Sequence, residues 1–189
     1  MKDFLNSTKK IFTNTNDEVF KRIYKMEAQD IAIALFFVFL TNYALTYLIY
    51  DSVDVLKPLA LTAILIIATF VLWVSGLLWR EHTNTISYWS KLYLLSTLSF
   101  AFNLIQIPLQ IIGKYIIPDG FSATYYGIMY SLLILTSNFM LLKIISLGFR
   151  FDMRKTLLTF ILFLSIVGVL IYFVQNQVGL IIPFFIVGK

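Results

Sequence analysis

The chain has 189 residues, of which 59% are hydrophobic and only 13% are charged, and its mean hydropathy is +0.84. Soluble domains have about 45–50% apolar and about 25% charged residues, and a domain of this size cannot bury such an apolar excess in one core. The composition therefore argues against a soluble enzyme and excludes a disordered chain, and the lack of cysteine excludes disulfides, thiolate catalysis and cysteine-ligated zinc.

The first 30 residues form a polar segment ahead of the first apolar run. Thr15 and Glu18 have the spacing of a capping box, so a helix is predicted to begin there. Apolar side chains fall on one side of this helix, and the cations Lys21, Arg22 and Lys25 fall on the other. The pattern favours an amphipathic helix in the membrane interface whose cations contact anionic lipid headgroups. The alternative is a helix that packs on the ends of a bundle.

Five apolar segments follow, each 18 to 21 residues long and free of Asp, Glu, Lys, Arg and His. A helix needs about 20 apolar residues to cross a hydrocarbon core of about 30 Å, and these continuous runs lack the alternation of membrane strands. The sequence therefore predicts an all-α membrane bundle, with residues 31–189 as one domain of five transmembrane helices. The predicted spans are 31–50, 59–79, 92–112, 125–142 and 157–174.

The Lys and Arg residues are divided unevenly between the two sets of flanks. Twelve of the 15 lie in the N-terminal segment and in the loops after the second and fourth spans. Cytoplasmic loops carry the excess of cations, so we expect the N-terminus in the cytoplasm and, after five spans, the C-terminus outside. This distribution also explains the net charge of +5 without a nucleic-acid partner. The last apolar run, 178–187, is too short to span; it is expected to lie at the outer interface or to re-enter the membrane.

The third span carries polar residues at alternating intervals of three and four positions, which places them on one helical face. These residues are Ser96, Ser99, Asn103, Gln106 and Gln110. Pro108 lies beside this face and is expected to kink the helix. On the fourth span, Gly127 and Ser131 are spaced for close helix approach, and Asn138 extends their face. Asn42 lies near the centre of the first span.

Two interpretations of this polar face are open. Amides and hydroxyls in membrane helices often join neighbouring helices, at about 0.6 kcal/mol per hydrogen bond. Five aligned polar residues exceed what packing requires, so the face also fits a polar path, a small-ligand pocket or a contact with a partner or lipid headgroup. Under both interpretations Asn103 and Gln106 point into the bundle toward Asn138, because an amide that faces lipid has no hydrogen-bond partner.

Enzyme signatures are missing from the sequence. The single histidine, His82, lies in a charged loop, and no hydrolase, metalloprotease or phosphate-binding motif is found. Asp51 and Asp54 are three residues apart and could share one helical face, but they lack a third ligand for a metal ion. The sequence therefore predicts a non-enzymatic protein with neither a cofactor nor a metal.

The layout resembles the Yip1 family of small integral membrane proteins, which have a polar cytoplasmic N-terminal segment, five spans and short loops. The similarity covers roughly residues 10–175 and includes the serine–aromatic stretch at 84–91 and a basic loop after residues 143–148. At the place of the family's proline near the start of the third span, this chain has serine, threonine and leucine at 96–99. The acidic-tyrosine-glycine-proline motif of eukaryotic members is also absent, so the resemblance does not extend to Rab GTPase binding.

The resemblance implies a protein that acts through partners or lipids in the membrane. Frequent Ile, Phe, Lys and Asn residues point to a bacterial member, so a multi-pass location in the bacterial inner membrane is expected. Expected partners are the bilayer with its anionic lipids and either another membrane protein or a second copy of the chain. The alternative function is a small transporter or channel component that uses the third-span polar face. A water-filled cavity along that face would favour transport, and a filled face would favour the first function.

Overall fold

The computed structural model describes residues 2–15, 28–51, 54–78, 87–149 and 151–178. Its regular elements in these ranges are six helices, and five of them are long and apolar enough to cross a membrane, which confirms the predicted all-α bundle. The helices are α1 (Lys2–Thr13), α3 (Ala28–Tyr50), α4 (Leu56–Leu78), α5 (Tyr88–Tyr115), α6 (Asp119–Phe149) and α7 (Met153–Val178).

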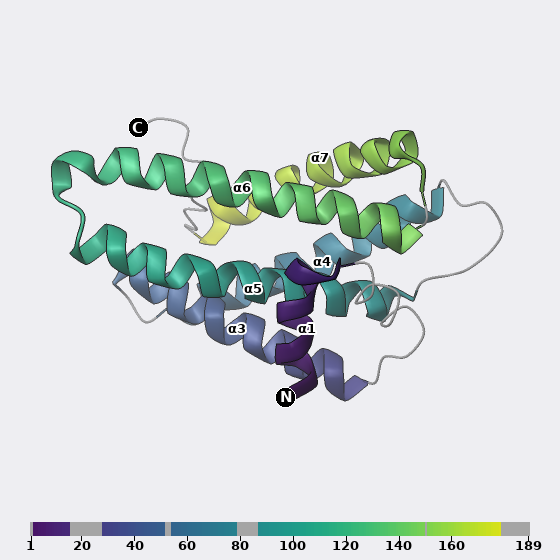
Figure 1. The fold of residues 1–189 in the computed structure, drawn as a ribbon, viewed down its shortest axis with the longest axis horizontal. Coiled ribbons are helices and arrows are strands. Elements are labelled where there is room, and N and C mark those ends of the chain that lie inside the picture. The colour runs from purple at the N-terminus through teal and green to yellow at the C-terminus, as the bar shows by residue number, and fades with distance from the viewer. Residues whose placement is uncertain (1, 16–27, 52–53, 79–86, 150, 179–189) are drawn as a thin grey trace.

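Helix α5 lies in the middle of the bundle. It packs most extensively against α3 and also contacts α1, α4 and α6, while α7 packs on α4 and α6. The long helices run lengthwise and α1 crosses them (Figure 1). We call the end where α5 begins and α6 finishes the Lys91 end, and the opposite end the Lys114 end. With 28 and 31 residues, α5 and α6 exceed the length of about 20 residues that the hydrocarbon core requires.

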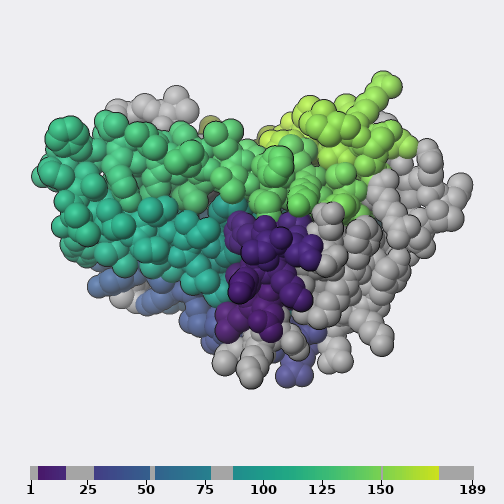
Figure 2. Space-filling view, in the orientation of Figure 1, coloured from purple at the N-terminus to yellow at the C-terminus, as the bar shows by residue number. Residues whose placement is uncertain are grey.

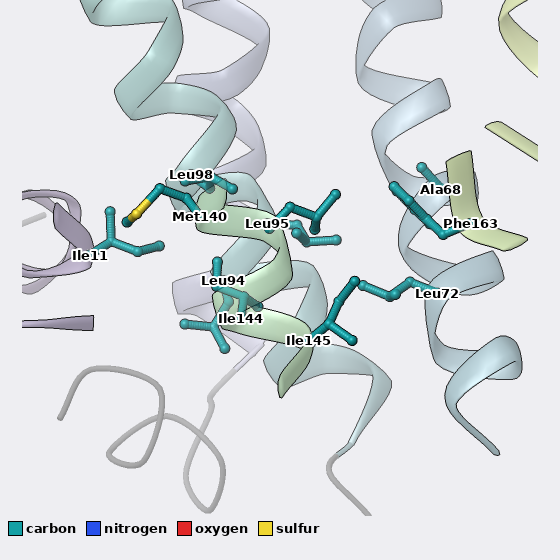
Figure 3. Packing of buried hydrophobic residues seen from close by; sticks show 11 residues of the cluster. Ile11, Ala68, Leu72, Leu94, Leu95, Leu98, Met140, Ile144, Ile145 and Phe163 are labelled. Carbon is teal, nitrogen blue, oxygen red and sulfur yellow. The ribbon is translucent and has the colours of Figure 1, made fainter. Parts of the chain in front are cut away.

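A cluster of buried apolar side chains, the central cluster, joins α1, α4, α5, α6 and α7. In Figure 3, Ile11 lies at one edge of it, Leu95 in the middle, and Ala68 and Phe163 at the other edge. Lipid tails are as apolar as these side chains, so the cluster stabilises the bundle mainly through close packing. Its buried members are Ile11, Ala68, Leu72, Leu94, Leu95, Leu98, Met140, Leu141, Ile144, Ile145 and Phe163.

Two glycines allow close approach to α6. A Cβ atom added to Gly76 on α4 would lie 1.8 Å from Cε1 of Phe149, so the ring of Phe149 occupies the space that a side chain would need. A Cβ atom added to Gly113 on α5 would lie 2.7 Å from the ring of Tyr126. Small residues at such points let membrane helices approach each other closely, and these two positions therefore fix how α6 sits on the bundle.

Charged side chains tie the helices together at the Lys114 end. The Nζ atom of Lys114 donates to the carbonyl oxygen of Leu48 at 3.0 Å and forms an ion pair with Asp51. Asp51 follows the last residue of α3 with a φ of 51°, a left-handed conformation that Asp tolerates better than most residues. A cation from α5 thus caps the negative end of the α3 dipole.

Helix α1 is an amphipathic helix that the sequence analysis did not predict. Its buried side includes Phe4, Ser7 and Ile11, and its exposed side includes Lys9 and Lys10. Figure 2 shows α1 lying across one face of the bundle, where it contacts α5. The signal was present as buried positions three and four residues apart, but the segment is short and its mean polarity concealed the pattern.

Phe4 is expected to be the main anchor of α1. Its ring lies 5.4 Å from the ring of Phe37 and 5.1 Å from that of Phe100, between centroids. Replacing a core Phe by Ala costs about 3–5 kcal/mol, so Phe4→Ala should raise amide hydrogen exchange in α1 at least about tenfold and leave α3 and α5 protected. Phe12→Ala is the control, because Phe12 is exposed and, among the described residues, its ring contacts only that of Phe102. Equal exchange in the two variants would show that Phe4 does not anchor α1.

Candidate functional site

The polar face of α5 lies inside the bundle. Because α5 is central, a face with a spacing of three and four residues is enclosed by the neighbouring helices. Asn103 and Gln106 are each 9% exposed, Gln110 is 5% exposed, Ser96 is fully buried, and Ser99 is half-buried. Pro108 lies within α5, which continues past it to Tyr115.

One part of this face forms a hydrogen-bond network with α3, which we call the amide network. The Nδ2 atom of Asn103 donates to Asn42 Oδ1 at 2.8 Å and to Thr41 Oγ1 at 3.0 Å. The Nδ2 atom of Asn42 donates in turn to Thr62 Oγ1 on α4 at 3.2 Å. The network therefore joins α3, α4 and α5 with groups that satisfy one another, which is the packing role expected of amides in a membrane.

A second part of the face contacts α6 near the Lys114 end. The Nε2 atom of Gln110 donates to the hydroxyl oxygen of Tyr130, and the hydroxyl of Tyr125 donates to the carbonyl oxygen of Leu109 at 2.8 Å. Pro108 has no N–H, so the backbone hydrogen bond lost here is the one to the carbonyl oxygen of Leu104. The tyrosines of α6 thus hold α5 and α6 together here. Tyr130 and Thr41 are hydrogen-bond partners that the sequence analysis missed.

The middle part of the face borders a cavity of about 260 Å³ between α4, α5, α6 and α7. Its polar lining comes from both α5 and α6: Ser99, Asn103, Gln106, Ser137 and Asn138. Its apolar lining is Leu65, Ala68, Leu95, Leu98, Phe102, Leu133, Leu141 and Phe163. No ionisable side chain is among these residues. The cavity can therefore donate and accept hydrogen bonds, but its lining offers no acid, base or counter-ion.

Two polar groups on the cavity wall lack hydrogen-bond partners. Within the described part of the chain, neither the carboxamide of Asn138 nor the hydroxyl of Ser99 makes a hydrogen bond, although both residues line the cavity. An unsatisfied polar group costs several kcal/mol in an apolar medium that lacks water. A site of this size and polarity is thus suited to water or to a ligand that supplies the missing bonds.

The partner of Asn103 differs from the predicted one. The sequence analysis directed Asn103 into the bundle toward Asn138, and the residue is buried there, but its hydrogen-bond partners are Thr41 and Asn42 on α3. Asn138 lines the cavity together with Asn103 but is not bonded to it. The physical reason is that α3, and not only α6, packs along the polar side of α5, and its polar pair Thr41–Asn42 lies level with Asn103.

The predicted contact through Gly127 and Ser131 is wrong. Both residues are exposed, and nothing lies within 4 Å of a Cβ atom placed on Gly127. The hydroxyl of Ser131 donates to the carbonyl oxygen of Gly127 at 2.8 Å, within its own helix. A serine can satisfy its hydroxyl in this way and face lipid, so the spacing of small residues did not identify the contact side of α6.

The proposed headgroup contacts Lys21, Arg22 and Lys25, and the helix predicted around them, lie outside the described residues. Thr15, the predicted N-cap of that helix, is buried, and its hydroxyl donates to the carbonyl oxygen of Ile11 at 2.7 Å. Thr15 is therefore bonded back to the last turn of α1. The interfacial helix therefore stays a prediction.

The sequence analysis assigned no role to Lys91, a residue at the start of α5. This lysine is only 4% exposed, and its Nζ atom lies 3.8 Å from the ring centroid of Phe149. A cation over an aromatic face is favourable, and more so when it is withdrawn from water. Phe149 also stacks on Phe151 at 5.0 Å. Lys91 therefore joins the start of α5 to the end of α6.

Comparison of the chain with family models, with curated proteins and with solved structures gives no match.

Proposed function

We propose that this chain is a non-enzymatic, multi-pass protein of the cell membrane, with Yip1-like organisation, and that its working site is the cavity beside α5, which binds a small molecule within the membrane. The proposal follows the alternative that uses the polar face of the third span, because that face borders a cavity and is not filled along its whole length. The bias of cations toward the N-terminal segment and the Lys91 end supports a cytoplasmic location for that end.

The observation that carries the proposal is that some polar residues beside α5 join helices, whereas others line the cavity. Asn103 is bonded to α3 and so serves packing. Ser99 and Asn138 face open space and have no bond within the described chain. A protein that used its polar residues only to join helices would gain by filling this volume with apolar side chains, since both the void and the unpaired groups are unfavourable.

Cysteine accessibility tests whether the cavity admits molecules from water. The chain has no cysteine, so Asn138→Cys and Leu135→Cys each introduce a single thiol at similar depth on α6. Leu135 is 68% exposed on the outside of the bundle, where it faces lipid. The thiolate is the reacting form and requires water, so we expect methyl methanethiosulfonate to label residue 138 at least about tenfold faster than residue 135. Equal, slow labelling would mean that the cavity is closed and dry and would contradict the proposal.

A further inference from the structure

Resting on the proposed function, we infer the class of molecule that the cavity takes: an uncharged molecule with one hydrogen-bonding head group and a short apolar chain. The head group binds near Asn138 and Ser99, and the chain lies among the apolar residues toward the Lys91 end. The inference follows from how polar and apolar groups are distributed along the cavity, from the lack of charge in its lining and from its volume.

The cavity is apolar toward the Lys91 end, and it is lined by a mixture of polar and apolar side chains, Phe102 and Leu133 among the latter, toward the Lys114 end. Helix α5 runs from the Lys91 end to the Lys114 end, so Leu95 and Leu98 precede Asn103 and Gln106 along the cavity. Helix α6 runs in the opposite direction, so Leu141 again lies nearer the Lys91 end than Asn138. At a rise of about 1.5 Å per residue, the lining of α5 extends over about 16 Å. The site is thus long enough to separate a head group from a chain.

The apolar end is lined by members of the central cluster. Leu95, Leu98 and Leu141 belong to both the cavity lining and that cluster, and so do Ala68 and Phe163. Figure 3 shows four of these side chains at a similar height in the bundle: Ala68 of α4, Leu95 and Leu98 of α5, and Phe163 of α7. A chain that enters this end meets only hydrocarbon groups, so the polar part of the molecule is held at the other end.

The lining selects against charge. A charged group withdrawn into an apolar medium is very unfavourable unless it is paired, and the lining residues that the structure describes include no Asp, Glu, Lys, Arg or His. The carboxamide of Asn138 offers both donors and an acceptor, and the hydroxyl of Ser99 can do either. An uncharged hydroxyl, carbonyl or amide therefore fits both groups without leaving a charge unpaired.

The volume of the cavity limits the size of the molecule that it can bind. About 260 Å³ corresponds to about nine water-sized groups at about 30 Å³ each. Octan-1-ol has this size and the inferred chemistry. Nonane has the same size without a head group, and octylammonium has the same size with a charged one. These three probes differ only in the property that the inference concerns.

The test measures protection of a thiol introduced by Ser137→Cys. Ser137 lines the cavity, and within the described residues its hydroxyl bonds only the carbonyl oxygen of Ile134 in its own helix, at 3.0 Å. Each probe is titrated into proteoliposomes, its concentration in the membrane is measured, and the rate of modification by methyl methanethiosulfonate is recorded at each concentration. We expect octan-1-ol to protect at concentrations about three- to tenfold lower than nonane or octylammonium, the advantage of about one net hydrogen bond. A thiol at Asp119→Cys, an exposed site at the Lys114 end, reports any general effect of the probes on the membrane.

Removing the head-group contact should remove this preference. In the Ser137→Cys background, Asn138→Leu keeps a similar size but loses the carboxamide, so octan-1-ol and nonane should then protect equally. Thr136→Val is the matched control, because Thr136 is exposed and bonds the carbonyl of Leu132 in its own helix; the preference should survive there. If residue 137 is reactive but the three probes protect equally, the inferred class is wrong and the proposed function stands. If residue 137 does not react at all, the proposed function fails.

Discussion

Replacing Gly76 by leucine is expected to destabilise the bundle strongly, whereas the same replacement at Gly127 is expected to be tolerated. Even a Cβ atom at Gly76 would lie 1.8 Å from Phe149 Cε1 and 2.1 Å from Cζ, so the ring must leave its place between α4 and Lys91. Overpacking of this kind costs about 1–3 kcal/mol or more. At Gly127 the space is open, and removal of a glycine from a helix gains about 0.5–1 kcal/mol.

Unfolding of the purified variants in mixed micelles measures both effects. The expected order of stability is Gly127→Leu at or above the parent chain and Gly76→Leu well below it. A rescue variant identifies the cause: Phe149→Ala makes room for the new side chain, so Gly76→Leu with Phe149→Ala should be more stable than Gly76→Leu alone. Two glycine variants of equal stability, or a rescue variant without recovery, would show that Phe149 is not what limits residue 76.

The two glycines illustrate which parts of the fold a sequence can predict. The five spans follow from local composition, since each is an apolar run of sufficient length, and all five are helices in the structure. The helix side that contacts a neighbour depends on residues far away in the chain. Gly127-x-x-x-Ser131 carries the pattern of a contact, yet its glycine faces open space, while Gly76 without such a partner meets Phe149.

In the candidate site, too, local sequence predicts some features, and others depend on residues far away in the chain. The spacing of polar residues on α5 placed Asn103, Gln106 and Gln110 on one side of a helix, and these residues are buried together. That spacing could not say which helix lies opposite each residue. Asn103 meets α3 and Gln110 meets Tyr130 on α6. The cavity is lined by α5 residues from Leu95 to Gln106, so most of it lies on the Lys91 side of these contacts. The cavity follows from how α4 and α7 complete the bundle, a long-range property that residue spacing does not contain.

The second large effect is expected in the amide network. Asn103→Leu leaves the Asn42 Oδ1 and Thr41 Oγ1 atoms without their donor, and Asn42→Leu leaves the Asn103 carboxamide with one fewer acceptor. An unsatisfied buried partner costs about 1–3 kcal/mol, so each single variant should lose about 1–2 kcal/mol of stability. The double variant replaces both amides by apolar groups of similar size, and its loss should be smaller than the sum of the two single losses.

The coupling energy distinguishes packing from pathway. Hydrogen bonds between membrane helices average about 0.6 kcal/mol and reach about 1.7 kcal/mol, so the double-mutant cycle of Asn42 and Asn103 should give a coupling in this range. A second cycle pairs Asn103→Leu with Asn138→Leu and should be additive within about 0.5 kcal/mol, because the structure records no hydrogen bond between these residues and only a shared cavity wall. Coupling to Asn138 without coupling to Asn42 would reverse the assignment, making Asn103 part of the cavity's binding surface and not a contact between α5 and α3.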